Sequence, residues 1–230
     1  MIIAIDGPAG AGKSTVTRQL AKRLGFQFLD TGAMYRAVTY VALSENVALD
    51  DQDALAKIAA NIELRFEGDN VIVNGEDVTA AIRKPEVTRK IKSIADAVEV
   101  RRHLVALQQK IASTGDFISE GRDQGTVAFP DATCKIYLTA STRFRAVRRS
   151  LQLEEQGVTA GLEEVIAEIN ARDYNDENRK VGRLLKADDA IEVNTDNKTI
   201  NDVVDELEQI AKEKFADAEL SQESSSGKAV

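Results

Sequence analysis

The feature that most restricts the fold of this chain is the segment from residue 7 to residue 15, which reads GPAGAGKST. Its pattern is glycine, any four residues, then Gly-Lys-Ser. A short apolar run, Ile2 to Ile5, precedes it directly, and an amphipathic stretch from Lys13 to just before Gly25 follows. A buried strand, a glycine-rich turn and a helix N-terminus in this order form a phosphate-binding loop. The segment therefore predicts an α/β core that binds ATP or GTP.

The residue types in this loop suit that chemistry. Glycine lets the backbone fold tightly enough for successive N–H groups to point at phosphate oxygens. The lysine is predicted to reach the β- and γ-phosphates, and the serine hydroxyl is predicted to bind Mg²⁺. The metal-binding candidate is Ser14, and the nucleotide-binding candidates are Gly7, Pro8, Ala9, Gly10, Ala11, Gly12, Lys13, Ser14 and Thr15.

Short apolar runs alternate with long amphipathic stretches along the rest of the chain, which is typical of an α/β fold with a parallel sheet. We predict four further strands, at residues 26–29, 117–119, 136–138 and 191–193, with helices between them. The predicted fold class is therefore α/β, with a five-stranded parallel core flanked by helices.

Two segments depart from this rhythm. Over residues 62–78 apolar and polar residues alternate, with Gly68 and Gly75 where hairpin turns would lie. We predict a small antiparallel insert there. From about residue 216 the chain is small, polar and serine-rich, so we expect a frayed or disordered tail over residues 216–230.

Composition excludes several classes of protein. The 230 residues carry a formal net charge of -8, which argues against broad nucleic-acid binding. Cys134 is the only cysteine, so an intrachain disulfide or a zinc site built from several cysteines is excluded. No apolar run approaches the roughly 20 residues of a membrane span. We expect a soluble, cytoplasmic monomer whose partners are small-molecule nucleotides, with no nucleic acid and no membrane.

Arginines gather in three segments after the phosphate loop: GRD at 121–123, a predicted helix from residue 143, and ARDYNDENR at 171–179. The first follows a predicted strand, where ligands bind in open α/β sheets. Helical spacing places members of the other two on common faces. Phosphoryl transfer gives a reason for such sets, because guanidinium groups stabilise charge on the transferring oxygens. The charged residues concerned are Arg122, Asp123, Arg143, Arg145, Arg148, Arg149, Arg172, Asp176 and Arg179.

Several blocks together resemble the bacterial cytidylate kinase family. They are the phosphate loop, LDTGAMYR at 29–36, VNGEDVT at 73–79, EGRDQGTVAFPDA at 120–132, and ARDYNDENR at 171–179. The resemblance spans residues 2 to about 210. It implies an enzyme that transfers the γ-phosphoryl of ATP to CMP or dCMP with Mg²⁺. It also implies a kinase core at 1–36 and 100–215, with a short helical lid at about 143–172, and an acceptor-binding region at 37–99 that contains the insert.

The resemblance implies roles for individual residues as well. Catalytic roles fall on Lys13, Arg122, Arg148, Arg149 and Arg179. Acceptor-binding roles fall on Thr31, Arg36, Ser93, Arg101, Glu120, Arg122, Asp123, Arg172 and Asp176. Within this set, Arg101 is implied to read the cytosine ring, and Thr31, Arg36 and Arg122 are implied to hold the acceptor phosphate.

Four positions differ from the usual pattern of that family. Lys92, next to Ser93, replaces a serine, Glu120 and Asn194 each replace an aspartate, and Arg183 replaces a proline. Two of these touch base recognition, so a kinase acting on UMP, dUMP or AMP remains an alternative. A nucleotide switch without phosphoryl-transfer activity is the other alternative. ADP formation that depends on an acceptor nucleotide separates these classes.

Overall fold

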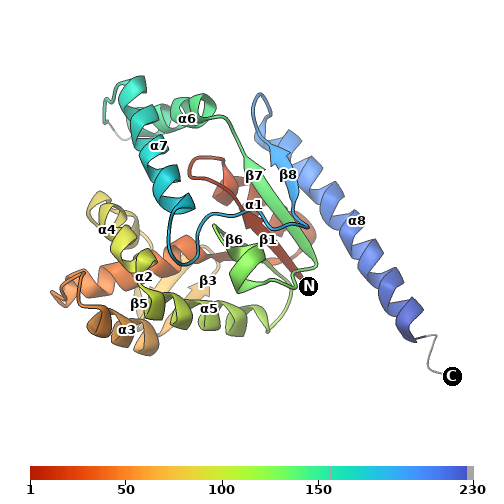
Figure 1. The fold of residues 1–230 in the computed structure, drawn as a ribbon, viewed down its shortest axis with the longest axis horizontal. Coiled ribbons are helices and arrows are strands. Elements are labelled where there is room, and N and C mark those ends of the chain that lie inside the picture. The colour runs from red at the N-terminus through yellow and green to blue at the C-terminus, as the bar shows by residue number, and fades with distance from the viewer. Residues whose placement is uncertain (156, 227–230) are drawn as a thin grey trace. The chain divides into compact units, whose positions relative to one another are not determined.

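The computed structural model describes residues 1–155 and 157–226, and the chain forms two compact units (Figure 1). Unit 1 comprises Met1–Leu29, Ala112–Arg179 and the chain from Arg183 onward. Unit 2 comprises Asp30–Ile111 together with Lys180–Gly182. Among the described residues, no helix has the length and apolar character needed to cross a membrane.

A five-stranded sheet forms the centre of unit 1. Its strands, in spatial order, are β2 (Gln27–Asp30), β6 (Phe117–Gly121), β1 (Ile2–Asp6), β7 (Cys134–Thr139) and β8 (Ile191–Asn194). β1 pairs in parallel with β6 and β7, and β7 pairs in parallel with β8. The five predicted apolar runs thus form the predicted sheet. Because parallel strands end at the same edge, the loops after β1, β6, β7 and β8 leave from that edge.

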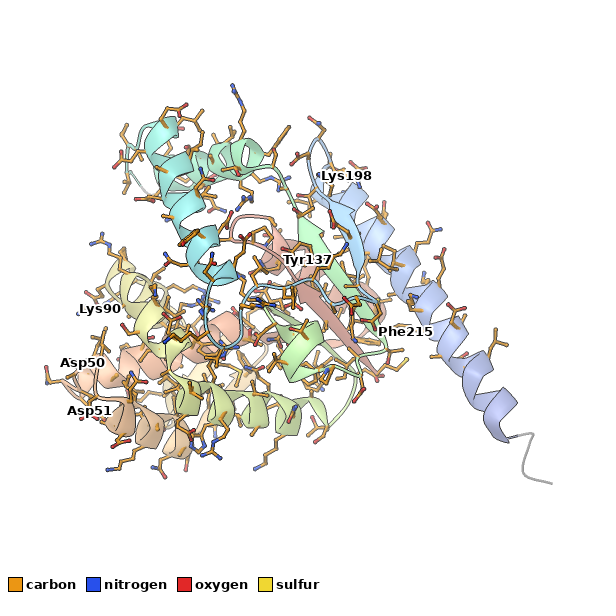
Figure 2. All side chains as sticks on the ribbon, in the orientation of Figure 1. Asp50, Asp51, Lys90, Tyr137, Lys198 and Phe215 are labelled. Carbon is orange, nitrogen blue, oxygen red and sulfur yellow. The ribbon has the colours of Figure 1, made fainter. Side chains whose placement is uncertain are left out.

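Helices cover this sheet and complete its core. α1 (Lys13–Leu24) ends at Gly25, as predicted, where the left-handed Gly25 donates its N–H to the Ala21 carbonyl. Figure 1 shows α8 (Ile200–Ser226) alongside β7 and β8. Leu20 of α1 and Leu207 of α8 are fully buried in the same apolar cluster as the strands. Further along α8, Phe215 (Figure 2) stacks on Phe26 with ring centroids 5.7 Å apart.

Two further helices of unit 1 lie side by side, α6 (Thr142–Glu155) and α7 (Leu162–Glu177) (Figure 1). Ala146, Val165 and Ile169 form their shared apolar contact. The segment at about 143–172, for which the family resemblance implies a lid, lies within this pair and the turn between the two helices; the lid itself stays a prediction.

The C-terminal segment differs from the expectation based on composition. α8 continues through Ser226, so residues 216–226 are helical, and residues 227–230 lie outside the described part of the chain. Alanine, glutamate and leucine are strong helix formers, and FADAEL at 215–220 carries them directly on from a packed helix.

Unit 2 combines helices with a small sheet. In chain order it contains α2 (Thr31–Ser44), α3 (Gln52–Asn61), β3 (Leu64–Glu67), β4 (Asn70–Val73), β5 (Glu76–Asp77), η1 (Ala81–Arg83), α4 (Pro85–Asp96) and α5 (Val98–Ala112). β3, β4 and β5 pair antiparallel, which confirms the insert predicted at 62–78. Gly68 and Gly75 have positive φ and lie at the two turns, as predicted. Asp30 caps α2 by accepting a hydrogen bond from the Ala33 N–H at 2.7 Å.

Candidate active site

The phosphate loop runs from the end of β1 into α1. A Cβ atom added to Gly7 would lie 1.9 Å from the backbone carbonyl oxygen of Leu138, so only glycine fits between the loop and β7. Gly12 has φ +91 and immediately precedes the first residue of α1. The first N–H groups of that helix have no partner within the helix, which makes this end suited to an anion.

Lys13 is buried at the first position of α1, with 7% of its surface exposed. Its Nζ donates to the carbonyl oxygens of Gly7 at 2.7 Å and Pro8 at 2.8 Å. Burial, followed by the positive charge of Arg122, lowers the pKa of Lys13 well below its usual value, and Glu120 opposes this shift. The negative charge of a bound phosphate would favour the protonated form of Lys13 and so raise its pKa.

Ser14 follows in the loop and meets a carboxylate. Its Oγ donates to Oε1 of Glu120, at the end of β6, over 2.5 Å. A hydroxyl and a carboxylate are oxygen donors of the type that Mg²⁺ prefers, together with water and phosphate oxygens. The described residues contain no cluster of three or more acidic, histidine or cysteine side chains that could enclose a metal alone. The pair therefore fits an Mg²⁺ ion that is bound mainly through nucleotide phosphates.

Asp6 fixes the loop that follows β6. Its two carboxylate oxygens accept hydrogen bonds from the backbone N–H groups of Gln124 and Gly125, each at 2.8 Å. Burial raises the pKa of Asp6 from 3.8 to about 6, although these two hydrogen bonds lower it. Gln124 also accepts from Ser119 Oγ at 2.7 Å. Asp6 was not among the residues that the sequence singled out, yet it positions the segment that carries Arg122.

Arg122 and Arg179 share the carboxylate of Asp176, near the end of α7. Asp176 accepts from Arg122 Nε and from Arg179 Nη2, each at 2.8 Å. Burial alone would raise the pKa of Asp176, but the charges of Arg122, Arg179 and Arg172 lower it below its usual value. The sequence predicted that Arg172, Asp176 and Arg179 share a helix face, but α7 ends at Glu177, so Arg179 reaches Asp176 from the segment just after the helix. Two arginines of this cluster, Arg122 and Arg172, act on Lys13, where Glu120 and Asp6 oppose them.

The arginines of α6 have three different environments, although their spacing predicts a common face. Arg145 is buried: its Nη1 donates to the Ala9 carbonyl at 3.1 Å, and its Nη2 pairs with Asp173 of α7 at 2.6 Å. Arg148 donates to Oγ1 and to the carbonyl of Thr195 at 2.9 and 2.8 Å. Arg149 is exposed. Packing against the loop and α7 thus gives Arg145 a structural position.

Arg145 and Arg148 both support the phosphate loop, Arg145 through the Ala9 carbonyl and Arg148 through Thr195. Thr195, just after β8, donates from Oγ1 to the carbonyl of Ala11 at 3.3 Å, so Arg148 is linked to the loop through it. A Cβ on Gly12 would lie 3.9 Å from Arg148 Nη1, which places this guanidinium beside the loop.

In unit 2, a second set of charges surrounds the start of α2. Asp30 accepts from Arg36 Nη2 with both carboxylate oxygens at 3.3 Å, and Arg83 Nη2 lies 3.8 Å from Asp30 Oδ2. Thr31 is buried at the first position of α2. The sequence did not single out Arg83, and its only signal would have been a basic residue ending the short η1 helix.

Arg101 lies on α5 in the same unit and is almost fully buried, with 6% exposed. Its Cζ lies 5.3 Å from the centre of the Tyr35 ring, and its Nη1 donates to the Ala95 carbonyl at 3.3 Å. Ser93 is half-buried on α4, whereas its neighbour Lys92 is exposed and pairs with Asp96 at 2.6 Å.

The family described as "Cytidylate kinase" matches residues 3–213. The chain belongs to the cytidylate kinase family. A cytidylate kinase of Geobacillus sp. is 48% identical over 217 residues, covering 93% of this chain and 97% of the relative. One of Rhodopirellula baltica is 47% identical over 213 residues, covering 93% of each chain. A gluconokinase from Sinorhizobium meliloti shares the fold, with TM-score 0.50, 14% identity and 95% coverage of both chains.

Membership of the cytidylate kinase family gives context to the four positions that differ from its usual pattern. Glu120, like the aspartate that is usual at this position, provides a carboxylate, and it accepts the hydrogen bond from Ser14. Lys92 forms a surface ion pair on α4. Asn194 accepts from the Asp196 N–H at 2.7 Å and so shapes the turn after β8. Nothing in the structure explains Arg183, which is exposed.

Proposed function

We propose that this protein transfers the γ-phosphoryl group of ATP to CMP or dCMP, giving ADP and CDP or dCDP. The observation that carries the proposal is the charge cluster of unit 1, in which Asp176 holds Arg122 and Arg179 at 2.8 Å and the charges of Arg122 and Arg172 help to lower the pKa of Lys13. Family membership supports the choice of acceptor, because the similar proteins of Geobacillus sp. and Rhodopirellula baltica are described as cytidylate kinases.

The phosphate loop is proposed to hold ATP. Its backbone N–H groups and Thr15 would bind the phosphates, and Lys13 would exchange its carbonyl partners for their oxygens. Mg²⁺, held through Ser14 with Glu120 beside it, would neutralise charge on the phosphates.

The arginines of unit 1 are proposed to stabilise the transferring group and the acceptor phosphate. An acceptor phosphate is already an oxyanion at neutral pH, so the reaction needs positive charge and alignment more than a general base. Asp176 holds Arg122 and Arg179 in fixed orientations, which lowers the cost of reorganising them. We assign catalysis to Lys13, Arg122, Arg148, Arg149 and Arg179, and acceptor contacts to Arg172, Asp176, Asp123 and Glu120.

Unit 2 is proposed to be the acceptor-binding part of the chain. Thr31 and Arg36 would contact the acceptor phosphate, and Ser93 and Arg101 would contact the base. Arg36 is held by Asp30, and Arg101 by Tyr35 and Ala95, so both guanidinium groups are oriented before a nucleotide binds. We further propose that the protein acts as a cytoplasmic monomer.

The test is ADP formation from ATP and Mg²⁺ with CMP, dCMP, UMP and AMP supplied in parallel. The proposal expects a large, selective response to CMP and dCMP. Equal rates with UMP or AMP would contradict the assigned base, and no rise above the rate with ATP alone would contradict the kinase activity.

Two variants make the test specific to the site. Lys13→Ala should lower kcat by about 100-fold or more, because it removes a charge aimed at the transferring phosphate. Lys57→Ala, at an exposed lysine of α3, is the control and should change neither kcat nor KM. Near-normal turnover by Lys13→Ala would refute the role of the loop.

A further inference from the structure

Gly182, in unit 2, lies directly against the guanidinium group of Arg101. A Cβ atom built on Gly182 would sit 1.8 Å from Nη2 of Arg101, 1.9 Å from Cζ and 2.3 Å from Nε. Cβ atoms in proteins essentially never come within 3.0 Å of another group in this way. The guanidinium group therefore occupies the space that any side chain at position 182 would need.

The same guanidinium group is confined by other neighbours. The Tyr35 ring, with 7% of its residue exposed, has its centre 5.3 Å from Cζ. The Ala95 carbonyl accepts from Nη1 at 3.3 Å. A planar guanidinium group that lies over an aromatic ring, donates to a carbonyl and abuts a glycine backbone is restricted in orientation. Gly182 thus helps to define where the donors of Arg101 lie.

We propose that Gly182 is a positioning residue for Arg101 and, through it, sets the preference for the acceptor base. This inference rests on the proposed function, in which Arg101 reads cytosine. A guanidinium group can only donate hydrogen bonds. Cytosine presents two acceptors, O2 and N3, on its pairing edge, whereas uracil presents an N–H donor at N3. A guanidinium group held in place therefore favours cytosine, and one pushed aside loses this discrimination.

A side chain at position 182 should change the position of Arg101 more than it destabilises the fold. The group that a new methyl would meet is the far end of a flexible side chain, so the clash is relieved when Arg101 moves. Gly182 has φ +60, and an alanine there also strains the backbone. Gly68, in the same unit, has the same φ of +60, and no described atom lies within 4 Å of its added Cβ. Gly68→Ala therefore reproduces the backbone strain without displacing Arg101.

The experiment measures kcat and KM for CMP and UMP, and the Kd of CMP by calorimetry. The variants are Gly182→Ala, Gly68→Ala, Arg101→Met and the double variant Gly182→Ala/Arg101→Met. Gly182→Ala should raise KM and Kd for CMP about 10-fold and weaken the preference for CMP over UMP by a similar factor. Its kcat at saturating CMP should stay within about 3-fold, because the transferring group is bound elsewhere.

The two single controls and the double variant identify the cause. Gly68→Ala should leave KM and the preference unchanged. In the Arg101→Met background, Gly182→Ala should add nothing to KM, because the group that it displaces has been removed. Gly182→Ala could lower the urea midpoint more than Gly68→Ala does. A urea midpoint that recovers in the double variant would then still identify Arg101 as the clashing group. A midpoint that does not recover would overturn the inference.

The remaining outcomes separate the inference from the function on which it rests. If Gly182→Ala behaves like Gly68→Ala while Arg101→Met loses the preference for CMP, the inference is overturned and the role of Arg101 stands. If Arg101→Met itself keeps the KM and the preference for CMP, the assigned role of Arg101 fails, and the inference fails with it.

Discussion

The surroundings of Asp6 predict how the free energy of unfolding depends on pH. The carboxylate is 4% exposed and accepts two backbone hydrogen bonds, yet burial raises its pKa from 3.8 to about 6. The folded protein therefore binds more protons than the unfolded chain between these two values. The free energy of unfolding must then fall as the pH rises through this range. The contribution of Asp6 is present below about pH 4 and is lost as the pH passes about 6.

The size of this effect follows from the two pKa values. At about 1.36 kcal/mol per pH unit, a pKa of about 6 in place of 3.8 corresponds to about 3 kcal/mol. Between pH 4 and pH 7.5 most of it, about 2.5 kcal/mol, should be expressed. Asp6→Asn removes the titration. It also replaces one acceptor by an amide that faces an N–H group, which costs about 1–3 kcal/mol at every pH.

The assay is equilibrium urea unfolding of the wild-type protein and Asp6→Asn at pH 4 and pH 7.5, followed by far-UV circular dichroism. The difference in unfolding free energy should move by about 2.5 kcal/mol in favour of the variant as the pH rises. Asp189→Asn is a control with the opposite sign, because the hydrogen bond from Lys135 lowers the pKa of that exposed carboxyl. A difference for Asp6→Asn that stays constant with pH would refute the argument.

Two further predictions concern residues that hold the phosphate loop. Gly7→Ala places a methyl group 1.9 Å from the Leu138 carbonyl oxygen, so it should prevent folding or lower the free energy of unfolding by well over about 3 kcal/mol. Gly25→Ala is the control, since no described atom lies within 4 Å of its added Cβ. It should lower the free energy of unfolding by about 1–2 kcal/mol. Urea midpoints compare the two, and equal costs would contradict the close contact. Arg145→Met removes a buried guanidinium group and leaves the partly buried Asp173 without its ion pair, which should cost about 3 kcal/mol. Thermal unfolding tests this, and Arg143→Met, at an exposed arginine of α6, should have little effect.

The sequence predicted those parts of the fold that depend on local patterns. The apolar runs of β1 and β6 predicted strands because a parallel strand buried on both faces needs no polar alternation. The helix after the phosphate loop begins at Lys13 and ends before Gly25, since glycine reaches the left-handed conformation without strain. The antiparallel insert followed from its alternation and its glycines.

The parts that the sequence could not predict depend on contacts between distant residues. Asp6 accepts hydrogen bonds from backbone groups 118 and 119 positions away, so nothing near it in the chain indicates its role. Arg145 and Arg148 differ by three residues on one helix, yet only packing against Asp173 and Thr195 decides which of them is buried. Gly182 has no motif of its own, and its importance follows only from the position of Arg101.

Several of the arginines assigned to the site are held by acidic partners, which has a consequence for nucleotide binding. Asp176 holds two guanidinium groups of unit 1, and Asp30 holds Arg36 in unit 2. These carboxylates keep the donors in place without an anion, but they do not cancel the positive charge that lowers the pKa of Lys13. Phosphate groups would supply the missing negative charge to donors that are already oriented. Binding then needs little rearrangement of the unit 1 arginines, and the same preorganisation stabilises charge that develops during transfer.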